Sequence, residues 1–228
     1  MQDSFTALLV SLVPYILGSA LVPIYIVLVV LLLKNPNQGL VKGIAFLAGL
    51  TLTRLVQGIV FGFVLMDAAA STAPDDKGLV VSTMLMGFGI IFLISAYKKW
   101  RKQTDSDDPP KWLIKIDNLT PAKAFGFGAG LPLISVKLWV FTLGALGTIA
   151  EVQVGQTASI TAYLIFIFLA QLLLLIPILI RLILPARAQS ILDKISAWLT
   201  KYNRAIVVGV SLVFGLLFLF KGISGLLA

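Results

Sequence analysis

The chain has 228 residues, of which 59% are hydrophobic and 12% are charged, and its mean hydropathy is +1.01. Soluble domains are about half apolar, so this composition indicates an integral membrane protein. The sequence contains neither cysteine nor histidine, which excludes disulfides, thiol chemistry and metal sites built on those residues. The formal net charge of +8 does not indicate nucleic-acid binding, because most Lys and Arg residues lie beside apolar runs, where they set membrane orientation.

Six stretches are apolar and long enough to cross a bilayer, which takes about 20 residues. Turn-forming or charged segments separate them, such as residues 35–37 and 74–78. The first stretch lacks a preceding basic region and is longer than the apolar core of a signal peptide, so we expect it to be retained. The expected spans are residues 6–33, 39–66, 79–97, 121–149, 157–184 and 205–227.

Basic residues concentrate in the first, third and fifth loops, whereas the second loop holds only Lys77 and the fourth holds none. The positive-inside rule therefore places the odd-numbered loops in the cytoplasm and both termini outside the cytoplasmic (inner) membrane. Apolar residues at helical spacing in residues 189–204 predict an interfacial helix, with an ordinary packed loop helix as the alternative. A basic cluster after the third span should attract anionic lipid headgroups, and the alternative is that it only sets membrane topology; it consists of Lys98, Lys99, Arg101 and Lys102.

Three spans followed by three spans predict two halves that insert in opposite orientations, the inverted repeat found in many secondary transporters. We expect a first half over residues 1–97, a basic cytoplasmic loop over 98–120, and a second half over 121–228 that includes the interfacial helix. The fold class is thus an all-α membrane protein with six transmembrane helices.

The first and fourth spans are the longest, and Gly, Ser or Pro residues interrupt each of them near its middle. A helix break at membrane depth is tolerated where it packs against protein or lines a wet cavity, so paired breaks indicate a central pathway. Close helix packing is the alternative, and we assign Gly58 and Gly62 of the second span to it. The residues expected at the breaks are Gly18, Ser19 and Pro23 in the first span, and Gly126, Gly128, Gly130 and Pro132 in the fourth.

Arg54 and Lys137 lie near the centres of apolar runs that contain no Asp or Glu. A charge at bilayer depth costs at least ~2.5 kcal/mol, so we expect an anion to neutralise these cations. The guanidinium of Arg54 suits a carboxylate, phosphate or sulfate. Lys137 is a candidate for the same anion or, if it loses its proton, for proton coupling. Purely structural roles, by snorkelling or by pairing with freed carbonyls, are the alternative.

Three neutral residues complete the candidate substrate site. Gln57 lies one turn after Arg54 on the same helix face, Gln171 lies at a similar depth in the fifth span, and Ser135 precedes Lys137 by two residues. We expect them to line a midplane cavity between the first, second, fourth and fifth spans. Without His, Cys or a carboxylate inside a span, we predict no catalytic residues, no cofactor and no metal, and therefore not an enzyme.

Several diffuse motifs resemble the peptidoglycolipid-addressing protein (GAP) family, which includes the sulfolipid-addressing protein and belongs to the lysine-exporter superfamily. They extend over nearly the whole chain. In the first half they are Val22-Pro23-Ile24-Tyr25-Ile26-Val27, Leu31-Leu32-Leu33 and Lys42-Gly43-Ile44-Ala45-Phe46-Leu47-Ala48-Gly49. In the second half they are Trp112-Leu113, Lys115-Ile116-Asp117, Leu119-Thr120-Pro121-Ala122-Lys123-Ala124, Leu192-Asp193, Ile195, Ala197-Trp198-Leu199 and Asn203.

The resemblance implies a six-span protein that moves a lipid, glycolipid or small metabolite outward across the cytoplasmic membrane. The fourth span in this family commonly carries Asn-Pro-Lys, where this chain has Ser135-Val136-Lys137 and so keeps only the lysine. The family also favours Ser-Pro where this chain has Val22-Pro23.

We therefore predict an exporter or flippase-like transporter for a compound with an anionic group. Amino-acid efflux, with Arg54 holding the substrate carboxylate, is one alternative. A non-transporting accessory subunit of a lipid synthesis or export complex is another, because the stretch over residues 98–123 is long enough to dock a partner. The expected partners are membrane lipids and an anionic substrate or headgroup, with no nucleic acid and with a homodimer as a candidate assembly.

Overall fold

Long apolar helices dominate the structure, a computed structural model that describes residues 2–35, 38–71, 74–101 and 119–227. Within these ranges the chain forms helices and short connections, without strands. Three helices are long and apolar enough to cross a membrane alone, namely α3 (Gly39–Ser71), α4 (Pro74–Arg101) and α9 (Pro185–Leu227). The helices in the described ranges, three of them apolar and long enough to span a membrane, confirm the prediction of an all-α membrane protein.

Three further spans are formed by pairs of helices that are bent at a short break. The bend is 55° between α1 (Gln2–Ala20) and α2 (Pro23–Lys34). It is 73° between α5 (Pro121–Ile134) and α6 (Val136–Val152), and 54° between α7 (Gln156–Ala170) and α8 (Leu172–Ile183). With each pair counted as one span, the described chain has the predicted six spans, including the broken first and fourth.

The positions of the breaks differ in part from the prediction. The first lies at residues 21–22, next to Pro23, which begins α2 because a proline at the first helical position needs no N–H partner. The fourth span breaks at Ser135, so the glycines and Pro132 expected at its break lie inside α5 instead. The fifth span breaks at Gln171, which the sequence analysis did not predict. Because α3 is continuous, the break in α7–α8 has no counterpart in the first half.

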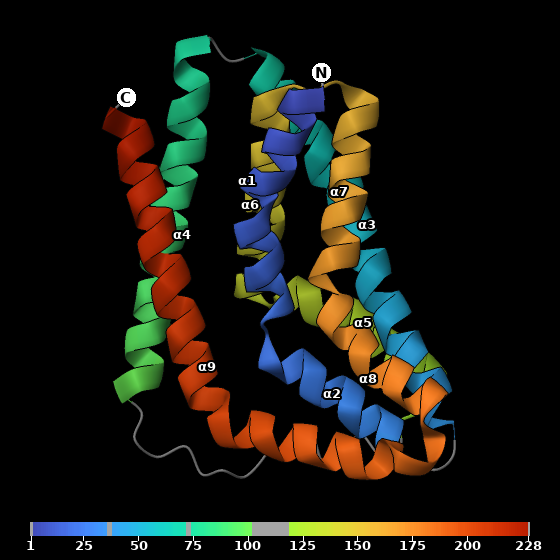
Figure 1. Ribbon diagram of the computed structural model, residues 1–228. Coiled ribbons are helices and arrows are strands. Elements are labelled where there is room, and N and C mark those ends of the chain that lie inside the picture. The colour runs from blue at the N-terminus through green and yellow to red at the C-terminus, as the bar shows by residue number, and fades with distance from the viewer. Residues whose placement is uncertain (1, 36–37, 72–73, 102–118, 228) are drawn as a thin grey trace.

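Residues 189–204 are helical, but they are the first part of α9 and are continuous with the last span. This part of α9 runs across the base of the molecule beneath α2 and α8, and the helix then turns upward beside α4 (Figure 1). The expected basic loop begins later than predicted, because α4 continues to Arg101. The remaining basic residues of that loop, within 102–118, lie outside the described residues.

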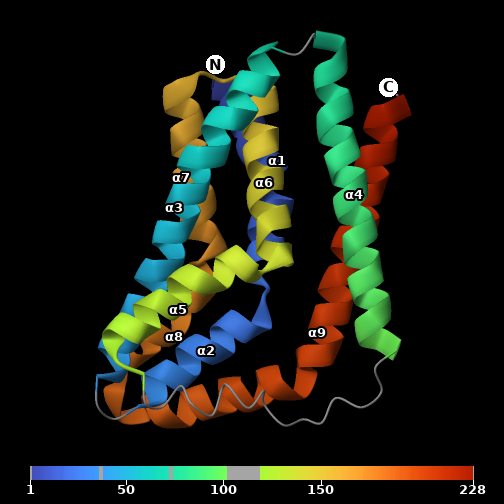
Figure 2. The same cartoon turned by 180° about the vertical axis from the view of Figure 1, so that it is seen from behind.

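Small residues allow the closest helix contacts. At the crossing of α3 and α5 (Figure 2), a Cβ atom on Gly128 would lie 1.9 Å from the carbonyl oxygen of Phe46. A Cβ atom on Gly49 would lie 2.1 Å from the carbonyl oxygen of Phe125. Gly128 is therefore a packing residue, because only a glycine lets the two backbones approach this closely.

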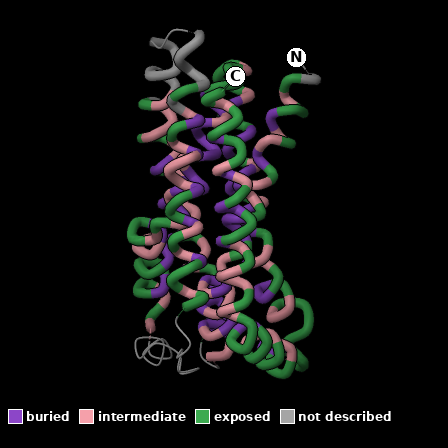
Figure 3. The backbone as a smooth tube through the Cα atoms, turned by 90° about the vertical axis from the view of Figure 1, so that its left-hand side faces the viewer, coloured by how far each residue is buried: buried purple, intermediate pink, exposed green. Residues whose placement is uncertain are grey.

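Buried residues follow the interior along the length of the molecule, and exposed residues face outward (Figure 3). The buried apolar side chains form two clusters, one centred on α1, α6, α7 and the upper parts of α4 and α9, the other on α2, the first part of α3, and α8. Many large apolar side chains on the outside are exposed, such as Ile134 at 77% and Phe220 at 73%. An exposed apolar surface of this kind is suited to lipid rather than to water.

Candidate functional site

Arg54 lies near the middle of α3 and is 1% exposed, which makes it one of the largest fully buried side chains in the described structure. Its Nη2 atom donates a hydrogen bond to the Ser19 hydroxyl at 2.5 Å, and its Cζ atom lies 5.7 Å from the ring centroid of Phe166. The Tyr163 hydroxyl donates to the Arg54 backbone carbonyl at 2.7 Å and ties α7 to this turn of α3. Helices α1, α3 and α7 thus meet at one buried cation.

Several donors at this site have no protein partner among the described residues. They are Nε and Nη1 of Arg54, the side-chain amide nitrogen of Gln57, and Nε2 of Gln171. Gln57 and Gln171 are each 3% exposed. The ion pair found in the described structure, Lys34 with Asp193 at 2.5 Å, joins α2 to α9 and does not involve Arg54. Buried donors without partners are rare in native proteins and call for an explanation, such as a ligand or water.

The three helix breaks lie at one level of the molecule, where α2, α6 and α8 each begin (Figures 1 and 2). A helix N-terminus carries partial positive charge and backbone N–H groups without an intrahelical partner. In transporters with discontinuous helices, such half-helix N-termini point at anionic parts of the substrate. Each break therefore offers the backbone N–H groups of one helix beside the C-terminal carbonyl groups of the preceding helix.

Polar side chains connect these breaks to α3. Gln171, at the break between α7 and α8, accepts a hydrogen bond from the Thr51 hydroxyl of α3 at 2.9 Å. Tyr25 of α2 lies close to Ser135, at the break between α5 and α6, and is near enough to Arg54 to experience its charge. Ser19, in the last turn of α1, accepts from Arg54. The structure thus gathers four of the predicted residues, Arg54, Ser19, Ser135 and Gln171, around the breaks.

Lys137 lies in a different environment. Its Nζ atom donates to the Ser211 hydroxyl of α9 at 2.8 Å and lies 5.7 Å from the ring centroid of Phe92 of α4. It also experiences the charge of Lys99 at the end of α4. Lys137 shares none of these described neighbours with Arg54. The bend after α5 turns the first residues of α6 toward α4 and α9, so the expected common anion for both cations finds no support in this geometry.

The other residues predicted at the breaks lie in packed helix contacts, inside α5 or beside a cavity. A Cβ atom on Gly18 would lie 2.1 Å from the Phe141 ring, so this glycine allows α1 to pack on α6. Pro132 is buried inside α5, and a Cβ atom added to Gly130 would meet no atom within 4 Å. Pro23 begins α2 and lines a cavity of about 590 Å³ between the break after α1, α8 and the first part of α9.

Two residues of the site, Thr51 and Phe166, were not predicted from the sequence. Thr51 lies three residues before Arg54 on the same helix face, a spacing that was available in the sequence as a signal. Phe166 gave no such signal, because it is one aromatic residue among many apolar ones. Its place below the guanidinium depends on how α7 packs against α3.

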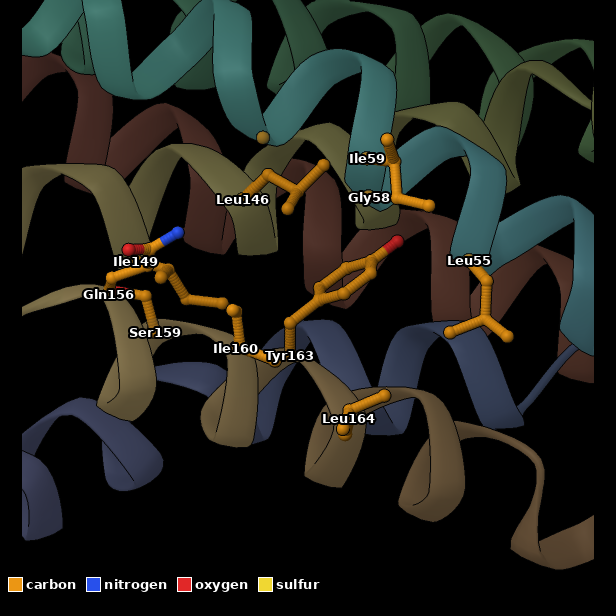
Figure 4. A pocket seen from close by; sticks show the side chains of 11 residues that line it. Leu55, Gly58, Ile59, Leu146, Ile149, Gln156, Ser159, Ile160, Tyr163 and Leu164 are labelled. Carbon is orange, nitrogen blue, oxygen red and sulfur yellow. The ribbon is translucent and has the colours of Figure 1, made fainter.

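A cavity of about 240 Å³ lies between α3, α6 and α7, one turn along α3 from Arg54 (Figure 4). In Figure 4 the Tyr163 ring reaches from α7 toward Gly58 of α3. The cavity lining, which we call the α3–α7 groove, consists of Leu55, Gly58, Ile59, Gly62, Leu146, Ile149, Gln156, Ser159, Ile160, Tyr163 and Leu164.

Comparison with protein families gives a match that covers nearly the whole chain. The family model described as Sap, sulfolipid-1-addressing protein, matches residues 12–224. This range includes every residue of the Arg54 site and confirms the resemblance that the sequence motifs indicated. No curated protein and no solved structure matches the chain. The chain belongs to the sulfolipid-1-addressing protein family.

Proposed function

We propose that the protein is an exporter or flippase-like transporter of the cytoplasmic membrane, with both termini outside. Its substrate is a lipid, glycolipid or small metabolite that carries an anionic group, and the anionic group binds at Arg54. The observation that carries this proposal is the buried guanidinium, whose Nε and Nη1 atoms have no hydrogen-bond partner among the described residues.

Electrostatics favour an anion over a neutral ligand at this position. An arginine stays charged in essentially any protein environment, and an isolated charge inside a protein or membrane is costly. No described carboxylate neutralises Arg54. A carboxylate, phosphate or sulfate would accept from Arg54 and Gln171 together and would remove this cost.

The broken helices support a transport cycle rather than a static binding site. Discontinuous helices around a midplane site are typical of secondary transporters, in which one part of the protein moves relative to another. An inverted repeat is part of this proposal, because the first span of each half is a bent pair. We infer that the half-helices α2 and α8 move at the breaks, while the continuous α3, with α5 packed closely against it, holds Arg54 in place.

Membership in a family named for addressing a sulfolipid supports a lipid role over amino-acid efflux. We propose that the protein performs no chemical step, since the sequence has no Cys or His to serve as nucleophile or base. Arg54 keeps its proton throughout, so it does not couple transport to proton movement and does not identify the energy source.

Reconstituted vesicles test the proposal directly. Vesicles that contain the purified protein and a fluorescent phosphatidate or phosphatidylglycerol report outward movement when a membrane-impermeant quencher is added. We expect Arg54→Leu to abolish protein-dependent movement while the protein stays folded and inserted. Lys221→Leu is the matched control, because it also removes a cation from a span but at an exposed position. Normal movement by folded Arg54→Leu would overturn the proposal.

A further inference from the structure

The α3–α7 groove begins at the depth of Arg54 and runs toward the N-terminus of α7. Leu55 and Leu164 lie at one end, and Ile149 and Gln156 lie at the other (Figure 4). From Leu55 to Gly62 the groove follows α3 for seven residues, which corresponds to ~10 Å at a rise of 1.5 Å per residue. One leaflet of a bilayer contributes about 15 Å of hydrocarbon, half of the ~30 Å core. The groove therefore extends through most of one leaflet.

The lining and the shape of this groove suit a hydrocarbon chain. Most of its lining residues are apolar, and its volume of about 240 Å³ exceeds the ~150 Å³ of an engineered apolar cavity that binds benzene. Rim residues are exposed on the outer surface of the helices, with Ile59 at 62%, Ile160 at 54% and Leu164 at 48%. A chain can thus enter sideways from the bilayer without crossing a polar barrier.

The groove lies beside the Arg54 site, and Tyr163 stands at the boundary between them. The ring of Tyr163 lines the groove, while its hydroxyl donates to the Arg54 backbone carbonyl at 2.7 Å. Leu55 follows Arg54 directly, and Gly58 lies one turn further along α3. The two sites are thus close enough for one molecule to place its anionic group at Arg54 and an apolar chain in the groove.

We propose that the α3–α7 groove holds an acyl chain of the transported lipid while its anionic headgroup occupies the Arg54 site. This inference rests on the proposed function, and it narrows the substrate to an acylated anion rather than a water-soluble metabolite. The leaflet reached by the groove is the one at the N-terminus of α7, which the distribution of basic residues predicts to be the outer leaflet.

Gly62 provides a way to fill the groove. A Cβ atom there would meet only Leu146 Cδ2, at 3.9 Å, so a larger side chain enters free space. Gly58 is unsuitable, because a Cβ atom would lie 2.1 Å from the Tyr163 ring. Gly209→Phe is the matched control, since Gly209 is exposed on α9 and has no atom within 4 Å of its Cβ position.

The experiment uses the full chain in nanodiscs that contain phosphatidate with a photoreactive group on its acyl chain. We expect cross-links to map to α3 and α7 in the wild type and in Gly209→Phe. In Gly62→Phe they should fall about 10- to 200-fold, the range by which a pocket rejects a misfit group. Arg54→Leu should reduce labelling by phosphatidate to the level seen with phosphatidylcholine of the same chain length.

Inorganic sulfate separates this inference from the proposed function. Sulfate has no chain, so it should raise the melting temperature of Gly62→Phe as much as that of the wild type, and should not stabilise Arg54→Leu. Undiminished cross-linking in Gly62→Phe, or cross-links confined to the cavity beneath α2 and α8, would overturn the groove assignment alone. Equal stabilisation of Arg54→Leu by sulfate would overturn the headgroup site. If Gly62→Phe does not fold, Ile160→Trp blocks the groove from its exposed rim.

Discussion

Replacing Arg54 by leucine should change the free energy of unfolding only slightly but should greatly weaken the binding of an anion. At the bilayer centre, leucine is favoured over arginine by about 3–4 kcal/mol on insertion scales. The substitution also removes a charged hydrogen bond to Ser19, worth ~1.5–3 kcal/mol, and a cation–π contact with Phe166 of about 0.5–2 kcal/mol. These opposing contributions nearly cancel, so the free energy of unfolding without ligand should change by no more than about 2 kcal/mol.

Arg54→Leu should change the affinity for an anion far more than it changes the free energy of unfolding. Losing one member of a buried charge pair costs ~2–5 kcal/mol, which corresponds to roughly a 30-fold to several-thousand-fold rise in Kd. At a ligand concentration of 100 times the wild-type Kd, the ligand stabilises the wild type by about 2.7 kcal/mol. A 30-fold weaker mutant would retain less than ~1 kcal/mol of this stabilisation at the same concentration.

Thermal unfolding of the purified protein, with and without sulfate, measures both quantities in one series. We expect the two ligand-free proteins to unfold at similar temperatures, and we expect sulfate to raise the unfolding temperature of the wild type only. A ligand-free Arg54→Leu protein that loses much more than about 2 kcal/mol would show that Arg54 has a mainly structural role. A ligand-dependent shift equal to that of the wild type would exclude Arg54 from the anion site. Lys221→Leu, at an exposed position, should behave like the wild type in both measurements.

Three further substitutions test the packing and the site. Gly128→Ala should lower the unfolding temperature, because its Cβ atom would overlap the Phe46 carbonyl at 1.9 Å and overpacking costs about 1–3 kcal/mol. Gln171→Leu should weaken sulfate binding about 2- to 13-fold, the equivalent of one neutral hydrogen bond of ~0.5–1.5 kcal/mol, as measured by titration calorimetry. Asp193→Ala should change the unfolding free energy by less than about 1 kcal/mol, because its ion pair with Lys34 is partly exposed.

The class of fold was readable from the sequence because hydropathy and chain length report directly on membrane spans. The breaks were less predictable, since glycine and proline serve both to interrupt helices and to let them pack closely. Pro23 does begin a new helix, whereas Gly128 lies at the closest approach of α5 to α3. The break at Gln171 had no local signal, because the nearest proline, Pro177, lies inside α8.

The sequence identifies the central residue of the candidate site, Arg54, but not all of the residues that surround it. A lone charge in an apolar run identifies Arg54 whatever its neighbours are, because the energetic cost is intrinsic to the residue. Its relation to Lys137 depends on the 73° bend between α5 and α6, which a linear pattern does not encode. Phe166 belongs to the site only through the packing of α7 against α3, so it required three-dimensional information, whereas the spacing of Thr51 from Arg54 was visible in the sequence.

The continuous helix α9 connects two parts of the molecule that lie far apart in the sequence. Its first part passes beneath α2 and α8 and is joined to α2 by the ion pair between Lys34 and Asp193. Its last part packs along α4 through glycines such as Gly215 and Gly222, whose Cβ positions lie within 3 Å of α4 atoms. One uninterrupted helical backbone therefore contacts both α2, whose first residue follows the break in the first span, and α4, which crosses the membrane as a single helix.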